Sequence, residues 1–267
     1  MKILQSIILG IVQGLTEFLP VSSSGHLIVI KKLFGIDQEQ FGLTYDIALH
    51  FATLIAVFIV FWPDILALLK KPIQKTTGLL IVATIPAALV GVFFDDYIES
   101  ISQSGGFLGL AFVFTAFLLF FSQKAKQKAK NIDLMSYKDA AVIGLMQGVA
   151  VMPGISRSGS TTSAGLIMGV EKESSMRFAF LMSIPVIMGS AVLGVKDIIT
   201  EPTAVEWAPV IAGMLAAGIS GYFAVKFMLN FFKKRSLNLF AVYVGILGVL
   251  ILIDQLFFKK FFTVFLM

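Results

Sequence analysis

The 267-residue chain has no cysteine and few charged residues. Without cysteine it can form no disulfide, no thiolate metal site and no cysteine nucleophile, so any chemistry must use Glu, His, Ser, Thr or Arg. Charged residues make up 14% of the chain and hydrophobic residues 57%, whereas soluble domains carry about 25% charged residues. A soluble globular fold is therefore excluded, as are a disordered and a collagen-like chain.

Long apolar segments recur along the whole chain, which is typical of a polytopic α-helical membrane protein. We place eight of them at about 3–30, 46–69, 78–94, 105–122, 140–168, 178–195, 207–230 and 238–258. A net charge of +5 in such a chain reflects membrane topology, and we expect no nucleic-acid partner. The N-terminal run has no small-residue cleavage site, so we expect it to be retained.

Polar stretches interrupt the first and fifth segments, at 20–25 and 153–159. Neither stretch could face lipid without leaving backbone groups unsatisfied, so both predict re-entrant hairpins. A shift of 134 residues aligns the two interruptions with identities on Gly, Gln and Ser: Gly10/Gly144, Gln13/Gln147, Gly14/Gly148, Ser22/Ser156, Ser24/Ser158 and Gly25/Gly159. We expect one integral membrane domain over 1–267, with repeat 1 at about 1–122 and repeat 2 at about 138–258.

The repeat predicts the topology. One hairpin plus three spans crosses the membrane an odd number of times, so repeat 2 is inverted relative to repeat 1. The expected fold is an all-α polytopic membrane protein with an inverted-topology repeat, six transmembrane spans and two re-entrant broken-helix hairpins. Thirteen basic residues fall on one side and six on the other, which makes the first side cytoplasmic. Both termini then face outward, and the hairpin tips meet near the midplane.

Glu17 lies inside an apolar run, where an acidic residue costs about 2.5–3.5 kcal/mol on insertion scales and indicates a functional site. Gln13 lies one helical turn earlier, on the same helix face. An amide oxygen and a carboxylate at this spacing could share a divalent cation such as Mg²⁺ or Ca²⁺. The alternative is a polar pair that only caps the hairpin. His50 is given no role.

Ser22, Ser23 and Ser24 precede an apolar run and predict the N-terminus of a half-helix, whose free N–H groups favour an anion. The alternative is that these serines are ordinary helix caps. His26 follows them and could act as a general base or nucleophile, or orient a partner.

Arg157 is the basic residue within the second interruption, and its planar fork of donors suits phosphate oxygens. Hydroxyls around it add donors, namely Ser156, Ser158 and Thr161. The alternative is an arginine that snorkels to the interface. A carboxylate, a histidine, hydroxyls and one arginine favour phosphoryl transfer or phosphate-ester hydrolysis over acyl transfer or redox chemistry. A transporter with an anion site is the competing class, because inverted repeats with broken helices are also a transporter architecture.

The two interrupted segments, QGLTEFLPVSSSGH at 13–26 and PGISRSGST at 153–161, resemble the undecaprenyl pyrophosphate phosphatases of bacteria, which are associated with bacitracin resistance. The resemblance implies a multi-pass enzyme of the bacterial inner membrane with a site open to the outside. It would convert the C55 polyprenyl pyrophosphate to the monophosphate and inorganic phosphate, recycling the carrier lipid for peptidoglycan synthesis.

The resemblance also implies roles for single residues. Gln13 and Glu17 match a motif linked to a divalent cation, although many family members have Glu at position 13. Ser23 and His26 match positions proposed as nucleophile or base. The pyrophosphate-binding motif is matched by Ser156, Arg157 and Thr161. The sequence leaves the nucleophile open between Ser23, His26 and water, and among partners it also leaves open a homodimer.

Overall fold

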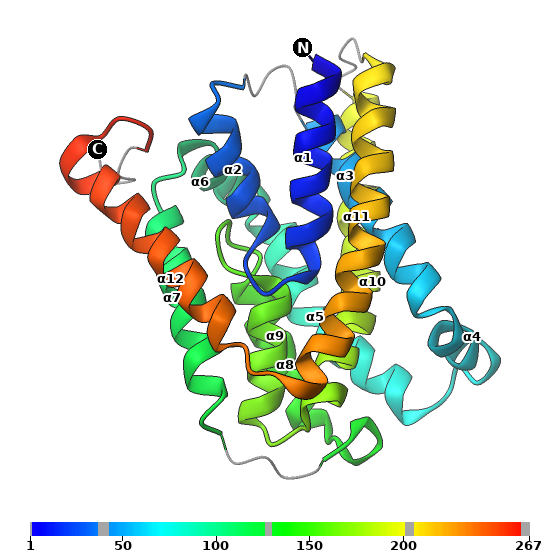
Figure 1. Ribbon diagram of the computed structural model, residues 1–267. Helices are drawn as coiled ribbons and strands as arrows, with labels where there is room; N and C mark the ends of the chain where they lie inside the picture. The colour runs from blue at the N-terminus through cyan, green and yellow to red at the C-terminus, as the bar shows by residue number, and fades with distance from the viewer. Residues whose placement is uncertain (1, 37–42, 126–129, 201–205, 263–267) are drawn as a thin grey trace.

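The computed structural model describes residues 2–36, 43–125, 130–200 and 206–262, and most of these residues lie in helices (Figure 1). In chain order they are α1 (Lys2–Phe18), α2 (Ser23–Leu33), α3 (Leu43–Val60), α4 (Trp62–Lys70), α5 (Lys75–Phe93), α6 (Asp95–Ser104), α7 (Leu108–Ser122), η1 (Ile132–Leu134), α8 (Tyr137–Val149), α9 (Arg157–Ile167), α10 (Lys172–Thr200), α11 (Trp207–Lys234), α12 (Asn238–Ile253) and η2 (Asp254–Phe258). Within those ranges the strand-like pairing is limited to one isolated bridge, between Lys130 and Val170.

Among the residues that the structure describes, four helices are long and apolar enough to cross a membrane: Lys75–Phe93, Lys172–Val192, Trp207–Lys234 and Asn238–Phe258. Helices α3 and α4 together give a fifth candidate, bent by 76°. Helix α7 is apolar but has 15 residues, fewer than the roughly 20 that a bilayer requires. The described chain is thus all-helical with four or five candidate spans, which confirms the predicted helical membrane protein at this level. The six-span arrangement stays a prediction.

Both polar interruptions break a helix, as predicted. The first break separates α1 from α2 and the second separates α8 from α9. The Ser158 hydroxyl donates to the Leu19 carbonyl at 3.0 Å, so the two turns touch, and Figure 1 shows them together near the middle of the molecule. The breaks therefore bring residues that lie about half a chain apart into one place.

Two close helix pairs hold the first arms of these hairpins: α1 packs on α11, and α8 packs on α5. A Cβ atom added at Gly14 would lie 2.3 Å from the Ala217 carbonyl oxygen, and one at Gly144 would lie 2.5 Å from that of Ala83. Any larger side chain at these two positions would push the helices apart.

The end of α1 is fixed by aromatic packing. The rings of Phe18 and Phe180 meet edge to face with centroids 5.7 Å apart, and Phe61 meets Phe180 in the same way at 5.9 Å. All three side chains are almost fully buried. The cluster joins the end of α1, the bend between α3 and α4, and α10, and it holds the residue next to Glu17 in place.

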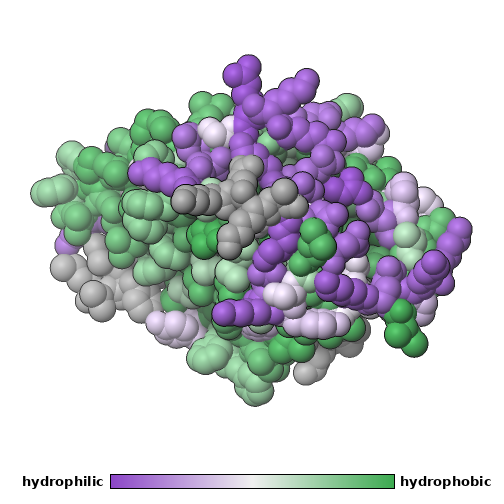
Figure 2. Space-filling model, turned by 90° about the horizontal axis from the view of Figure 1, so that it is seen from below, coloured by the Kyte–Doolittle hydropathy of each residue, from purple (hydrophilic) through white to green (hydrophobic). Residues whose placement is uncertain are grey.

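Large apolar side chains cover the outer faces of the long helices. On α11, Ile211, Ile219 and Phe223 are each more than half exposed, a pattern that suits contact with lipid tails. Figure 2 views the lower end of the molecule and shows hydrophilic residues gathered over part of that end, with hydrophobic residues on its flanks.

Candidate active site

Glu17 lies at the centre of a polar cluster near the end of α1. One carboxylate oxygen accepts the Ser23 hydroxyl at 2.6 Å and the Gln13 side-chain amide at 3.1 Å. The other oxygen accepts a hydrogen bond from the Arg157 guanidinium, which also forms an ion pair with it. The Glu17 side chain is 4% exposed and that of Arg157 is 17% exposed, so the pair compensates two charges that would be costly to bury alone.

The first break places Ser23 opposite Glu17. Pro20 cannot continue the α1 helix, because it has no N–H to donate. Ser22 then caps α2, with its hydroxyl oxygen accepting the Gly25 N–H at 3.3 Å. Helix α2 therefore begins at Ser23, and its first hydroxyl faces back toward the end of α1.

The second break brings Arg157 to the same point. Ser156 caps α9 by accepting the Gly159 N–H at 3.1 Å, and its own N–H donates to the Thr115 hydroxyl at 3.1 Å. Gly154 has a φ of 88°, which glycine adopts without strain. Arg157 is the first residue of α9, so its guanidinium extends from that helix end to Glu17 in the other hairpin.

The remaining predicted hydroxyls have partners within the two turns, including the Leu19 carbonyl that accepts from Ser158. Ser22 and Ser24 lie 3.4 Å apart between their hydroxyl oxygens, and those of Ser156 and Ser158 lie 3.3 Å apart. The Thr161 hydroxyl donates to the Arg157 carbonyl at 2.8 Å. All of these side chains lie at the two helix starts, and the caps weighed as the alternative for Ser22 are present in the structure.

His26 is turned toward other partners than the Glu17 cluster. Its Nδ1 lies 2.7 Å from the Ser22 carbonyl oxygen and its Nε2 lies 2.8 Å from the Tyr243 hydroxyl of α12. Both ring nitrogens are therefore engaged away from Ser23. The sequence carries no signal for Tyr243, because aromatic residues are common on apolar spans and do not indicate a functional site.

His50 of α3 joins the cluster although the sequence analysis gave it no role. Its Nδ1 lies 3.1 Å from the Gln13 amide nitrogen and 3.7 Å from a Glu17 carboxylate oxygen. The signal that could have found it is a histidine within an apolar segment, which is rare at membrane depth and marks a functional site.

Two oxygen donors in the cluster, the Glu17 carboxylate and the Gln13 amide, fit a divalent cation. The Gln13 amide oxygen is buried and has no hydrogen-bond partner among the described residues, which leaves it free to bind a cation beside the Glu17 carboxylate. Across the described ranges no group of three or more His, Asp or Glu side chains could hold a metal. The donor set therefore suits an ion that takes its remaining oxygens from a phosphate substrate and water, as Mg²⁺ commonly does.

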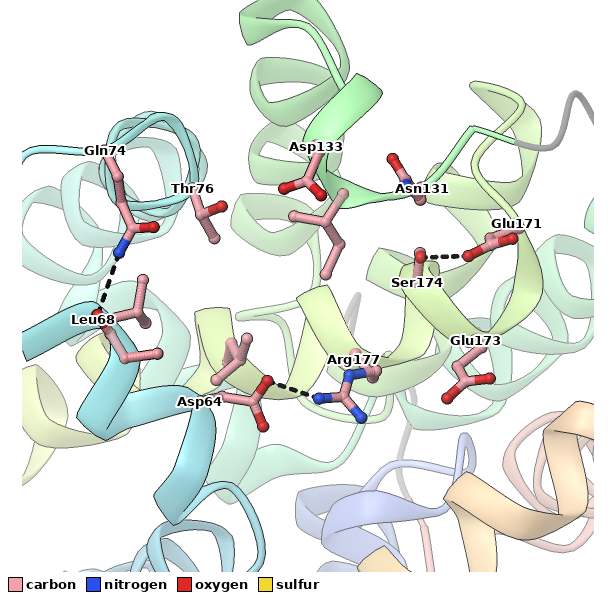
Figure 3. A pocket seen from close by; sticks show the side chains of 13 residues that line it. Asp64, Leu68, Gln74, Thr76, Asn131, Asp133, Glu171, Glu173, Ser174 and Arg177 are labelled. Carbon is pink, nitrogen blue, oxygen red and sulfur yellow. Dashed lines mark hydrogen bonds and ion pairs between the residues drawn. The ribbon is translucent and has the colours of Figure 1, made fainter. Parts of the chain in front are cut away.

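A polar cavity of about 360 Å³ lies apart from this cluster, between α4, the start of α5, η1 and the start of α10 (Figure 3). Arg177 donates to Asp64 across it at 2.6 Å, and Ser174 donates to Glu171 at 2.7 Å. It is not lined by any of the predicted site residues. The chemistry expected from the sequence is thus confined to the two hairpin turns.

The chain is similar to one family of known bacterial proteins over most of its length. The family model of the bacitracin resistance protein BacA matches residues 6–250. A protein of Carboxydothermus hydrogenoformans named undecaprenyl-diphosphatase is 44% identical over 258 residues, covering 96% of this chain and 98% of its own. A protein of the same name from Halothermothrix orenii is 41% identical over 256 residues, covering 95% and 98%. An undecaprenyl-diphosphatase 4 from Bacillus cereus is 43% identical, covering 96% and 98%. With this coverage and identity, the chain belongs to the bacitracin resistance protein BacA family.

Proposed function

We propose that this chain is a membrane-bound undecaprenyl-diphosphatase. It hydrolyses the C55 polyprenyl pyrophosphate to the monophosphate and inorganic phosphate, recycles the carrier lipid for peptidoglycan synthesis and confers bacitracin resistance. The observation that carries the proposal is the contact between the two hairpins, in which Glu17 holds the Ser23 hydroxyl on one oxygen and the Arg157 guanidinium on the other.

The Ser23–Glu17 contact suits nucleophilic catalysis. A hydroxyl that donates to a carboxylate at 2.6 Å has a general base within reach of its proton. Ser23 Oγ would attack the terminal phosphorus as its proton passes to Glu17, and the bond to the bridging oxygen would break to release the lipid monophosphate. Water would then hydrolyse the phosphoserine. Direct attack by water and attack by His26 are the alternatives, and for His26 the ring would first have to leave Tyr243 and Ser22.

Substrate binding would rely on Arg157 and the two helix starts. The guanidinium fork matches phosphate oxygens, and the free N–H groups at the starts of α2 and α9 favour negative charge. We assign the substrate-binding hydroxyls to the same two turns: Ser22, Ser24, Ser156, Ser158 and Thr161. A bound pyrophosphate would take over part of the interaction that Arg157 makes with Glu17.

Gln13 and Glu17 would hold a divalent cation, Mg²⁺ or Ca²⁺, which would neutralise charge on the pyrophosphate when bound. The unpaired Gln13 amide oxygen supports this assignment. His50 lies beside both residues and would help to orient the Gln13 amide.

The topology that we propose is the inverted repeat, with six spans, two hairpins, both termini outside and the site open to the outer side of the bacterial inner membrane. Reciprocal packing supports it: α1 of repeat 1 packs on α11 of repeat 2, while α8 of repeat 2 packs on α5 of repeat 1. Helices α7 and α12, the last of each repeat, pack on each other. A homodimer remains an expectation from the sequence.

Lipid transport or flipping, the other function considered, is less favoured. Transport of a phosphorylated lipid requires an anion site, but it requires neither a hydroxyl held by a carboxylate nor a cation-binding pair. The Ser23–Glu17 contact therefore favours hydrolysis.

The test is phosphate release from undecaprenyl pyrophosphate in detergent micelles, with Mg²⁺ or Ca²⁺ and with a chelator. Wild type should release phosphate and the chelator should stop it. Glu17→Ala, Ser23→Ala and Arg157→Ala should each lower kcat by at least about 10²-fold. Arg177→Ala is the matched control, because Arg177 also pairs with a carboxylate but lies at the polar cavity between α4 and α10.

Two results would contradict the proposal. If folded wild type released no phosphate with any divalent cation, the proposed hydrolase function would be contradicted and lipid transport would be favoured. If Arg157→Ala had activity close to that of Arg177→Ala, the assignment of the active site to the Glu17 cluster would be contradicted.

A further inference from the structure

His26 is held between two apolar helices, α7 and α12, rather than within the Glu17 cluster. Its ring stacks on that of Tyr243 from α12, with centroids 5.7 Å apart and planes at 21°, and meets the Phe112 ring of α7 edge to face at 5.4 Å. The residue is 8% exposed. This packing leaves the imidazole little freedom to rotate.

The hydrogen bonds of His26 define one tautomer of the neutral ring. The Ser22 carbonyl, 2.7 Å from Nδ1, can only accept, so Nδ1 carries the proton. Nε2 is then an acceptor, and the Tyr243 hydroxyl donates to it at 2.8 Å. Tyr243, 217 residues away in sequence, thereby orients the ring in the tautomer that the Ser22 carbonyl selects.

The backbone that His26 holds is strained. Ser22 has φ 72° and ψ 104°, and among the described residues only one other non-glycine residue has a positive φ. Such a conformation persists where the surroundings impose it, and it is concentrated at functional sites. Here the Ser22 carbonyl accepts both the His26 N–H at 3.2 Å and the ring Nδ1–H. Ser22 directly precedes Ser23, so its dihedral angles set where the Ser23 hydroxyl points.

We propose that Tyr243 is a positioning residue for the Ser23 hydroxyl. The Tyr243 hydroxyl fixes His26, His26 holds the Ser22 backbone in its positive-φ conformation, and that conformation aims Ser23 at Glu17. This role rests on the proposed hydrolysis. It also ties a membrane span, α12, to the tip of the first hairpin.

The first experiment compares Tyr243→Phe, which removes only the hydroxyl, with Tyr222→Phe on the neighbouring span α11. Tyr243→Phe should lower kcat about 3- to 10-fold, the effect of one lost hydrogen bond. KM should be unchanged, because Tyr243 is not among the proposed substrate-binding residues and its hydroxyl is bound to His26. Tyr222→Phe should match wild type. Equal kcat values for the two variants would overturn the proposal.

Two further backgrounds test the chain of contacts. In His26→Ala, adding Tyr243→Phe should have no further effect on kcat, whereas an additive loss would show that Tyr243 acts by another route. In Ser22→Gly, where the positive φ carries no strain, Tyr243→Phe should lower kcat by a smaller factor than it does in wild type. An equal factor would contradict the role of the Ser22 backbone.

A readout without turnover separates this proposal from the proposed function. The chain has two histidines, so ¹⁵N-labelled histidine gives NMR signals from two rings, assigned with His26→Ala. Wild type should show His26 protonated on Nδ1 only, and Tyr243→Phe should shift the His26 signals while leaving those of His50 in place. His26 protonated on Nε2 alone would overturn the proposal even if hydrolysis is intact. Absence of phosphate release with the expected spectrum would overturn only the function.

Discussion

At the scale of single residues, two glutamines that the 134-residue shift aligns, Gln13 and Gln147, lie in different environments. Gln13 donates to Glu17 and lies beside His50. Gln147 is 1% exposed, and neither atom of its amide has a partner among the described residues. Gln13 thus has polar neighbours that Gln147 lacks, and Val151 stands at the position that the shift aligns with Glu17.

Gln13→Glu should tighten the binding of the divalent cation, because cation affinity rises with the number of charged ligands. The concentration of Mg²⁺ or Ca²⁺ that gives half-maximal phosphate release should fall about tenfold. The measurement is a titration of activity with each cation, with Gln147→Glu as the matched control in the other repeat. If Gln13→Glu left the titration unchanged, position 13 would not bind the cation.

Gln147→Leu should stabilise the protein or leave its stability unchanged. A buried polar atom without a partner costs about 1–3 kcal/mol, and leucine fills a similar volume without that cost. Thermal unfolding in detergent should show an equal or higher Tm, and phosphate release should persist. Gln13→Leu, which loses the contacts to Glu17 and His50, should instead lose activity. A large drop in Tm for Gln147→Leu would mean that an internal water satisfies its amide.

The sequence predicted part of this site and missed part of it for a physical reason. Glu17, Ser23 and Arg157 were identifiable because charged and hydroxyl residues at membrane depth are costly and interrupt apolar runs. The partners of His26 were not, because Tyr243 lies on another span and meets His26 only through packing. The same holds for His50, whose contacts with Gln13 and Glu17 depend on how α3 lies beside α1.

At the scale of helices, serine residues cap the starts of three of the four helices that form the two hairpins. Ser22 and Ser156 start the second arms of the two hairpins, and Ser136 starts α8 with a capping box, in which Ser136 and Asp139 bind each other's backbone N–H groups. The sequence could predict both breaks from proline, glycine and serine. For the bend between α3 and α4 the signal is Pro63, which lies in the first turn of α4. The apolar residues around Phe61 continue the hydrophobic pattern, so 46–69 is predicted as one segment.

The Asp139 cap should make stability depend on pH. Burial alone would raise the pKa of the Asp139 carboxyl, but hydrogen bonds from the Ser136 N–H and the Lys130 ammonium bring that pKa below its usual range. A lowered pKa in the folded state stabilises the protein above the unfolded value, about 3.9 for Asp, and this contribution is lost as pH falls through the folded value.

The variant that tests this is Asp139→Asn, measured by thermal unfolding in detergent from pH 7 to pH 3. It should be less stable than wild type by about 1 kcal/mol at pH 7, and the difference should narrow as the pH falls below about 3.9 toward pH 3. Asp133→Asn, on the exposed turn η1, serves as control. A difference between wild type and Asp139→Asn that stays constant with pH would exclude the ionised cap as its source.

At the scale of the whole molecule, the start of α1 and the end of α12 lie toward the same end in Figure 1, while α4 and the end of α11 lie toward the other. The lower end in that view carries Lys70 of α4 and Lys233 and Lys234 of α11. Since positive residues accumulate on the cytoplasmic side, the lower end should be cytoplasmic and both termini should lie outside.

The absence of cysteine allows a direct test, because each introduced cysteine is then the only thiol in the chain. Ser100→Cys and Lys260→Cys should react with a membrane-impermeant maleimide on intact cells. Ile73→Cys and Lys234→Cys should react only after the cells are permeabilised. Retained phosphatase activity would show that each variant is folded.

The four positions form two pairs that each bracket one candidate span. Positions 73 and 100 lie on either side of α5, and positions 234 and 260 lie on either side of α12. If both members of a pair reacted on the same side, the helix between them would not cross the membrane. That result would contradict the proposed inverted-repeat topology. If both pairs were reversed together, the spans would stand but the site would open to the cytoplasm. The labelling therefore distinguishes an error in the fold from an error in orientation, because each pair tests its own helix independently of the loop charges that predicted the direction.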